Sequence, residues 1–271
     1  MVLSKADLGS VRALFMQSNI LLVLLALLCF VFSKLVSAYR LNSFFNASGV
    51  RIADSVNLKL YLLGMFYNLF LPGGIGGDGF KVYWLRRNLG APVKKGLLAI
   101  LFDRVTGVFA LFILCLLFGM FMKQSIVSDY LIVMTIAVGF ALLYVIVYRW
   151  FRRFYPVLNS TNFQSFVVQG SQVVCAALIL LSLGHSNQLF TYLFVFLLSS
   201  VAASVPVSIG GIGIREATFL YAAGVLHLDV TTSLSLSLMF FIISALVSLT
   251  GIIYAVKPEK IISLPQSLKA G

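Results

Sequence analysis

Charged side chains stand in apolar surroundings at three places in the sequence. Asp103 and Arg104 are neighbours inside an apolar run, and Arg215 and Glu216 precede another such run. Asp78 lies in a glycine-rich stretch that follows an apolar segment. Ionisable groups in apolar segments are costly to bury and are candidates for function. An arginine there can hold a phosphate through two parallel hydrogen bonds, and a carboxylate can pair with the arginine or engage a cationic group.

The composition indicates that these charges lie in a membrane. The chain has 271 residues, of which 61% are hydrophobic and 10% are charged, whereas a soluble domain is about 25% charged. This excludes an ordinary water-soluble enzyme. The net charge of +12 would suggest nucleic acid in a soluble protein, but in a membrane protein it indicates basic cytoplasmic loops facing anionic lipid. We therefore expect a multi-pass protein of the bacterial inner or plasma membrane, with no nucleic-acid partner.

Two of the charged sites adjoin a repeated glycine motif. Residues 72–81 read PGGIGGDGFK and residues 206–215 read PVSIGGIGIR, so both fit P-x-x-I-G-G-x-G-[FI]-[KR]. Glycine permits bends and close approach, and N–H groups exposed at such a turn bind anions. With Lys81 and Arg215 close by, the motifs predict a site for the phosphate of a lipid head group, unless they only allow helices to pack closely. The glycines are Gly76, Gly77, Gly79, Gly210, Gly211 and Gly213.

The apolar runs predict an all-α polytopic protein with about six to eight membrane helices, since each needs about 20 mostly apolar residues. Two segments, 60–80 and 189–226, are apolar but are interrupted by glycines and by Pro72 or Pro206. Such interruptions predict broken or re-entrant helices. The five uninterrupted runs are residues 13–33, 97–121, 130–148, 166–184 and 233–256.

The order of these segments predicts one membrane domain, residues 1–271, built from an internal repeat. Each unit reads span, broken segment, span: the first covers about 13–121, the second about 166–256, and 130–148 is a linker helix. If the broken segments re-enter, the repeats are inverted, which is a common plan of transporters and the arrangement we prefer. If both segments cross fully, the repeats are parallel.

Basic residues predict which loops face the cytoplasm. The positive-inside rule places residues 81–95, residues 149–165 and the C-terminal tail inside. The segment 34–59 is interpreted as a loop whose side depends on 60–80: it is inside if 60–80 is a hairpin and outside if 60–80 crosses. The count of basic residues favours the hairpin. The basic residues of the ambiguous segment are Lys34, Arg40, Arg51 and Lys59.

Each charged candidate also has a simpler explanation. Asp103 and Arg104 could lie near enough to the interface to reach water along their side chains, and so could Arg215 and Glu216. Asp78 could stabilise the start of a helix in a solvated loop.

The sequence predicts neither a metal site nor a catalytic residue. Cys29, Cys115 and Cys175 lie in separate apolar runs without metal-ligand spacing and are interpreted as small buried side chains. His185 and His227 lie in short loops and are interpreted as interfacial residues. We expect no cofactor.

The segments NLFLPGGIGGDGFKVYWLRR and PVSIGGIGIREATF, together with the DR pair at 103–104, resemble the lysylphosphatidylglycerol synthase transmembrane family. This family is the flippase-like membrane module of the multiple peptide resistance factor and of many stand-alone proteins. The likeness covers nearly the whole chain. It implies translocation of aminoacylated phospholipid or a related glycolipid between leaflets. It also implies functional roles for Asp78, Arg104 and Glu216.

Bifunctional members of the family carry a soluble aminoacyltransferase domain after the membrane module. Because this chain ends at Gly271, we expect a flippase module alone, and lysyl transfer is not implied. The substrate expected from the resemblance is a phospholipid or a polyprenyl-linked lipid.

Three classes of function compete. The first is a lipid transporter, not an enzyme, that binds the head group between the two glycine loops. The second is a lipid-modifying membrane enzyme, which is disfavoured because the chain has no D-x-D motif and no histidine supported by acids. The third is a scaffold for an envelope enzyme, which would leave the buried charges unexplained. A homodimer is compatible with each.

Overall fold

The computed structural model describes residues 8–71, 76–121, 128–204 and 213–262. Within these ranges all regular structure is helical, which confirms the prediction of an all-α polytopic membrane protein. Five helices are long and apolar enough to cross a membrane, and they correspond to the five predicted spans. They are α2 (Ile20–Ser48), α5 (Val93–Met120), α6 (Asp129–Trp150), α7 (Tyr155–Ser182, after the 3-10 turn Arg152–Phe154) and α10 (Val230–Leu249).

The two interrupted segments fold as pairs of short helices. The first pair is α3 (Asp54–Phe70) with α4 (Gly76–Leu89), and the second is α8 (Leu189–Ala203) with α9 (Ile214–Leu226). In the first pair, Oδ1 of Asn68 in α3 accepts the N–H of Gly77 in α4. One turn earlier in α3, Gly64 lies against Lys81, which is one turn later in α4. The two helices therefore run in opposite directions. Three shorter helices lie near the ends of the chain: α1 (Leu8–Gln17), α11 (Ile252–Val256) and α12 (Glu259–Ile262).

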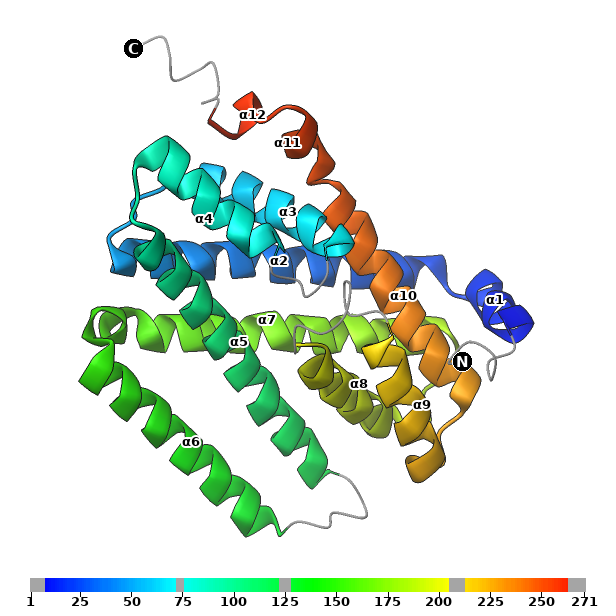
Figure 1. The fold of residues 1–271 in the computed structure, drawn as a ribbon. Helices are drawn as coiled ribbons and strands as arrows, with labels where there is room; N and C mark the ends of the chain where they lie inside the picture. The colour runs from blue at the N-terminus through cyan, green and yellow to red at the C-terminus, as the bar shows by residue number, and fades with distance from the viewer. Residues whose placement is uncertain (1–7, 72–75, 122–127, 205–212, 263–271) are drawn as a thin grey trace.

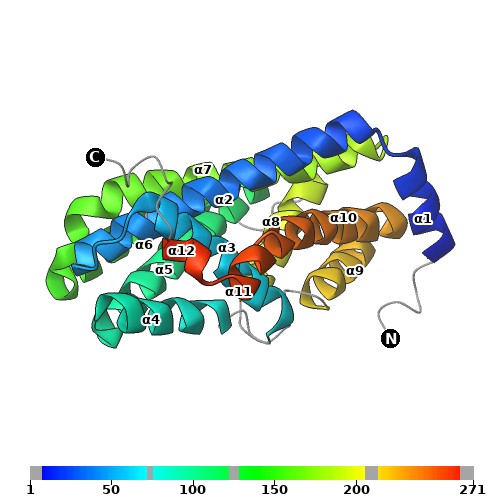
Figure 2. The same ribbon diagram turned by 90° about the horizontal axis from the view of Figure 1, so that it is seen from above.

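The directions of the long helices match those that an inverted repeat requires. Figure 1 shows α2 and α7 side by side and running in opposite directions, and Figure 2 shows the same pairing from above. The chain also runs in opposite directions through α5 and α10 (Figure 1). The pair α3/α4 starts and finishes at the end of the molecule where α2 ends and α5 begins (Figure 1). The pair α8/α9 starts and finishes where α7 ends and α10 begins. The repeat itself stays a prediction.

The loops with predicted cytoplasmic basic residues lie at one end of the molecule. The α4–α5 and α6–α7 junctions lie at the same end as the α2–α3 junction (Figure 1). This arrangement favours the hairpin alternative, in which residues 60–80 do not cross the membrane.

The first span differs from its predicted bounds. Residues 8–17 form a separate helix, and α2 begins only after Asn19, whose side chain accepts the N–H of Leu21 at 3.0 Å. The helix then continues to Gly49, which ends it in a left-handed conformation with φ of 83°. The prediction that Lys34 and Arg40 lie in a loop is therefore wrong. These charges interrupt the apolar run without breaking the helix, since no glycine or proline precedes Gly49 in α2.

Two clusters of buried apolar side chains form the core, and each surrounds one helix pair. The cluster around α8/α9 includes Phe30 of α2, Phe196 of α8 and Phe240 of α10. The cluster around α3/α4 includes Phe102 of α5 stacked on Phe154, with ring centroids 4.3 Å apart. Because α2 contributes side chains to both clusters, it holds the two helix pairs in one body.

Helix α3 is held on two sides by backbone contacts that only glycine permits. A Cβ atom at Gly77 of α4 would overlap the carbonyl group of Gly64 in α3. A Cβ atom at Gly251, between α10 and α11, would overlap the carbonyl group of Leu62. Small residues allow membrane helices to approach closely in this way. The close approach at Gly77 brings the first turn of α4, which carries Asp78, against α3 at Gly64 and Asn68.

We expect Gly77→Ala and Gly251→Ala to destabilise the protein, because the added methyl group forces two backbones apart. Overpacking of this kind costs about 1–3 kcal/mol. Gly170→Ala is the matched control, since a Cβ atom at Gly170 of α7 meets no atom within 4 Å. Unfolding in detergent measures the difference. Equal stability of Gly77→Ala and Gly170→Ala would contradict the close approach.

The hairpin arrangement predicts that residues 53 and 88, which flank the first helix pair, face the same side of the membrane. Both Ala53 and Asn88 are exposed. In a chain without its three native cysteines, Cys introduced at either position should react with an impermeant maleimide from the same side. Labelling from opposite sides would mean that residues 60–80 cross the membrane.

Candidate functional site

Charged side chains of four helices form a continuous group inside the protein, which we call the polar row. Helix α2 contributes two cations, α4 and α5 each contribute an acid and a cation, and α9 contributes a cation and an acid. The structure thus groups the predicted charges and adds two residues of α2. The polar row consists of Lys34, Arg40, Asp78, Lys81, Asp103, Arg104, Arg215 and Glu216.

Asp78 lies between two cations. Its Oδ1 is 3.0 Å from Nζ of Lys81, and its Oδ2 accepts a hydrogen bond from Nε of Arg104 at 2.6 Å. Asp78 and Lys81 are buried, whereas the side chain of Arg104 is 39% exposed. Asp78 also lies in the first turn of α4, where the helix dipole favours a negative charge. The three residues join α4 to α5, and the side chain of Arg104 remains partly exposed.

Asp103 forms an ion pair with a different helix, α2. Its Oδ1 accepts a hydrogen bond from Nε of the buried Arg40 at 2.8 Å, and Nη1 of Arg40 donates to Oγ of Ser165 at 2.8 Å. Gly107 gives this guanidinium room, because a Cβ atom there would lie 3.3 Å from Nη2 of Arg40. The ion pair therefore links α2, α5 and α7. Asp103 and Arg104 do not act as one pair, although they are neighbours in the sequence.

Arg215 and Glu216 also have separate surroundings. Glu216 is buried; its Oε2 accepts the N–H of Gly213 at 2.7 Å, and its Oε1 accepts the hydroxyl of Ser237 at 2.9 Å. It thereby caps α9 and ties it to α10. The guanidinium of Arg215 lies against aromatic rings, 4.7 Å from the centroid of Phe240.

Two members of the polar row, Lys34 and Arg40, were missed by the assignment of residues 34–59 to a loop. A signal for Arg40 exists in the sequence. Ser33, Ser37 and Arg40 recur at helical spacing in an apolar run, and all three are buried. That spacing places them on one face of a helix, so a polar stripe on α2 could have been predicted.

The glycines of the two motifs differ in their surroundings. The N–H of Gly77 donates to Oδ1 of Asn68 at 2.8 Å, and the N–H of Gly213 is bound by Glu216. These two predicted anion donors are thus occupied by side chains of the protein. Gly76 begins α4, and Gly79 is exposed with open space around it. Gly210 and Gly211 lie outside the described residues.

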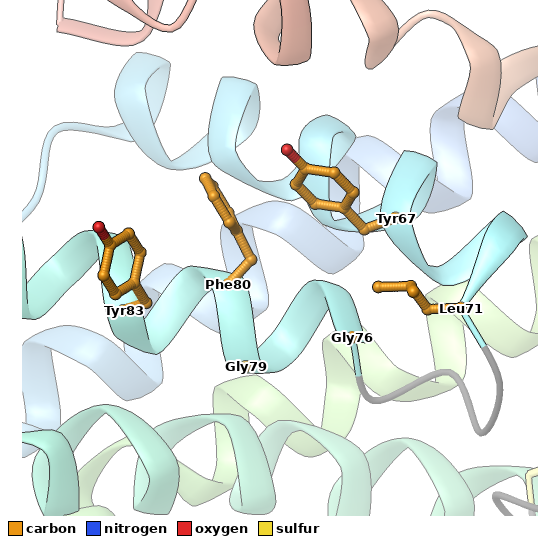
Figure 3. A pocket seen from close by; sticks show the side chains of 6 residues that line it. All are labelled: Tyr67, Leu71, Gly76, Gly79, Phe80 and Tyr83. Atoms are coloured by element: carbon orange, nitrogen blue, oxygen red, sulfur yellow. The ribbon is translucent and has the colours of Figure 1, made fainter.

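A pocket of about 300 Å³ lies against α4 (Figure 3), on the face of this helix opposite to Asp78 and Lys81. Aromatic side chains of both helices of the first pair line the pocket. Because α4 turns by about 100° per residue, the residues of α4 that line the pocket point away from Asp78 and Lys81. The pocket therefore offers apolar contacts directly behind a charged site. It is lined by Tyr67, Leu71, Gly76, Gly79, Phe80 and Tyr83.

The two histidines lie away from the polar row's acids. His185 precedes α8 and places Nε2 3.0 Å from Oγ1 of Thr232, and His227 ends α9 with φ of 52°. Thr232 also bonds Asp229, which caps α10. Burial raises the pKa of Asp229, but the hydrogen bonds from Thr232 outweigh burial and hold the pKa below its usual range. Within the ranges that the structure describes, no three acidic, histidine or cysteine residues gather as metal ligands.

Long apolar helices, short helix pairs and an internal row of charges define an integral membrane protein with a polar interior. The chain belongs to the family described as the lysylphosphatidylglycerol synthase TM region, which it matches over residues 1–164. This confirms the resemblance seen in the motifs. The UPF0104 membrane protein PH1989 of Pyrococcus horikoshii is 23% identical over 258 residues, covering 75% of this chain and 76% of that protein. No solved structure matches the chain.

We expect Asp103→Asn to destabilise the protein by about 3–5 kcal/mol, because it leaves Arg40 buried without a counter-charge. The double variant Arg40→Met/Asp103→Asn should recover much of this loss, since it removes the unpaired charge as well. Asp129→Asn is the control, because Asp129 is exposed. Unfolding in mixed detergents measures all three. Equal stability of Asp103→Asn and Asp129→Asn would contradict a buried ion pair.

Proposed function

We propose that the protein moves a phospholipid or a polyprenyl-linked lipid between the leaflets of the membrane, with its head group bound between the two glycine motifs. The polar row is the observation that supports this most. Ionisable residues inside membrane domains mark substrate pathways, and this row extends from the first helix pair to the second. The proposal is for a transporter without a catalytic step.

The contacts of Asp78 suggest how a head group would bind. Without substrate, the carboxylate neutralises both Lys81 and Arg104. A phosphate arriving at the partly exposed Arg104 can replace the carboxylate as its partner. The carboxylate then remains available to Lys81 or to an amine on the head group. Exchange between such partners lets a charged group enter without leaving a buried charge unpaired.

The helix pairs suit this role because they reach the interior from opposite ends of the molecule (Figure 1). Short helices that meet inside a membrane protein are a common feature of substrate sites in transporters. The aromatic pocket (Figure 3) gives a hydrocarbon chain a place on the opposite face of α4 from Asp78. A lipid could thus keep its tail outside the polar row while its head group moves along it.

A non-transporting scaffold is the second candidate. The contacts of Arg40 favour it, because Arg40 binds Asp103 and Ser165 and so holds three long helices together. Glu216 likewise serves to fix α9. A scaffold would account for these two residues. It would not account for the partial exposure of Arg104, a charged side chain of the polar row.

Leaflet exchange of labelled lipids in liposomes tests the proposal. We expect Arg104→Gln and Glu216→Gln to slow exchange at least about tenfold, the effect of losing one charge-assisted hydrogen bond. Arg149→Gln, a change at an exposed residue, should leave the rate unchanged. If wild-type protein exchanges no class of lipid above the rate of empty liposomes, the transport proposal fails and the scaffold is favoured.

A further inference from the structure

The polar row contains more positive charge than its own acids can neutralise. It has five cations and three carboxylates. Arg40, Lys81 and Arg104 each bind an aspartate. The remaining two cations are Lys34 of α2 and Arg215 of α9, and among the described residues neither has a carboxylate within ion-pair distance.

Arg215 has an unused hydrogen-bond donor in the interior. Its Nη1 atom is buried and has no hydrogen-bond partner within the described part of the chain. The nearest acid in sequence, Glu216, has both oxygens engaged by Gly213 and Ser237. A buried donor without a partner costs about 1–3 kcal/mol, and more when it is charged. Glu216 cannot remove this cost without uncapping α9.

The two cations share one group of aromatic rings. Nζ of Lys34 lies 4.6 Å from the centroid of Phe30, and the guanidinium carbon of Arg215 lies 5.6 Å from Phe196 and 4.7 Å from Phe240. The rings of Phe30 and Phe240 are 5.5 Å apart, and those of Phe196 and Phe240 are 4.8 Å apart. Each ring attracts a cation only weakly compared with a carboxylate. The charges are therefore held in place without being neutralised.

Lys34 and Arg215 also repel each other. The positive charge of Arg215 acts on Lys34, and Arg40 adds to this effect, with Asp103 as the opposing acid. Burial has the largest effect on Lys34, and the low dielectric constant of the interior makes the repulsion from Arg215 stronger than it would be in water. An anion placed between the two cations would convert the repulsion into attraction and would give Nη1 of Arg215 a hydrogen-bond acceptor.

We propose that Lys34 and Arg215 form a subsite for a phosphate group, the anionic part of the head group of the transported lipid. Phosphate suits both partners, because a guanidinium binds it with two parallel hydrogen bonds and an ammonium binds it as a point charge. That the phosphate belongs to a lipid rests on the proposed function. The subsite joins α2, which precedes the first helix pair, to the start of α9 in the second pair.

Binding of short-chain phosphatidylglycerol to the full chain in detergent tests the subsite. The readout is the shift in thermal midpoint, with inorganic phosphate and diacylglycerol as the other two probes. We expect wild type to bind phosphatidylglycerol, to bind inorganic phosphate more weakly, and not to bind diacylglycerol. Lys34→Met and Arg215→Met should each weaken binding about tenfold or more.

The control variant is Arg152→Met. Arg152 also lies over an aromatic ring, 5.4 Å from the centroid of Tyr148, but it is exposed and outside the polar row. Its loss should leave lipid binding unchanged. Lys34→Arg and Arg215→Lys keep the charge and should keep binding within a few-fold, so the test survives if a methionine variant fails to fold.

Unchanged phosphatidylglycerol binding in the Lys34→Met/Arg215→Met double variant would overturn the subsite. If inorganic phosphate and phosphatidylglycerol bind with equal affinity, the claim that the phosphate comes from a lipid is overturned. The outcomes also separate the subsite from transport. If wild type exchanges no lipid but its binding depends on both cations, transport fails and the subsite stands. If exchange and binding are normal in the double variant, the subsite fails and transport stands.

Discussion

The ion pair between Arg40 and Asp103 sets the orientation of α5, and the charged site depends on that orientation. Asp103 faces α2 because Arg40 lies there, bonded also to Ser165 of α7. Successive helical residues point about 100° apart, so Arg104 is turned towards α4 and meets Asp78. A membrane interior offers no water to replace either partner. One buried contact between long helices thus helps to position Arg104, whose side chain is partly exposed.

Much of the fold could be predicted because membranes impose strict lengths. The five long apolar runs, the two interrupted segments and the family followed from hydrophobicity and from the glycine motifs. The extent of α2 could not be obtained in this way. Counting apolar residues ends a span at the first charge, whereas α2 continues through Lys34 and Arg40 to Gly49. Arg40 can lie inside the protein because Asp103 of α5 and Ser165 of α7 bind it, and the residues of α2 alone do not reveal these partners.

Six of the eight members of the polar row were predicted from the sequence, but their pairing was not. Asp78, Lys81 and Arg104 were each singled out by type and position, and the structure places them together. That neighbours such as Asp103 and Arg104 would bind different helices depends on packing, which a single sequence does not encode visibly. The glycines show the same limit. Gly77 serves close packing against Gly64, a residue outside the motif, whereas Gly79 has open space.

The contact between Gly251 and Leu62 joins parts of the chain that are made at different times. Leu62 belongs to α3, early in the sequence, whereas Gly251 follows α10 near the C-terminal end. A membrane protein enters the bilayer as it is synthesised, so α3 leaves the ribosome long before its final neighbour exists. The side of α3 that contacts Gly251 therefore has no protein neighbour there until translation is almost complete. Assembly of the polar interior is then a late event in biosynthesis, and truncated chains would lack it.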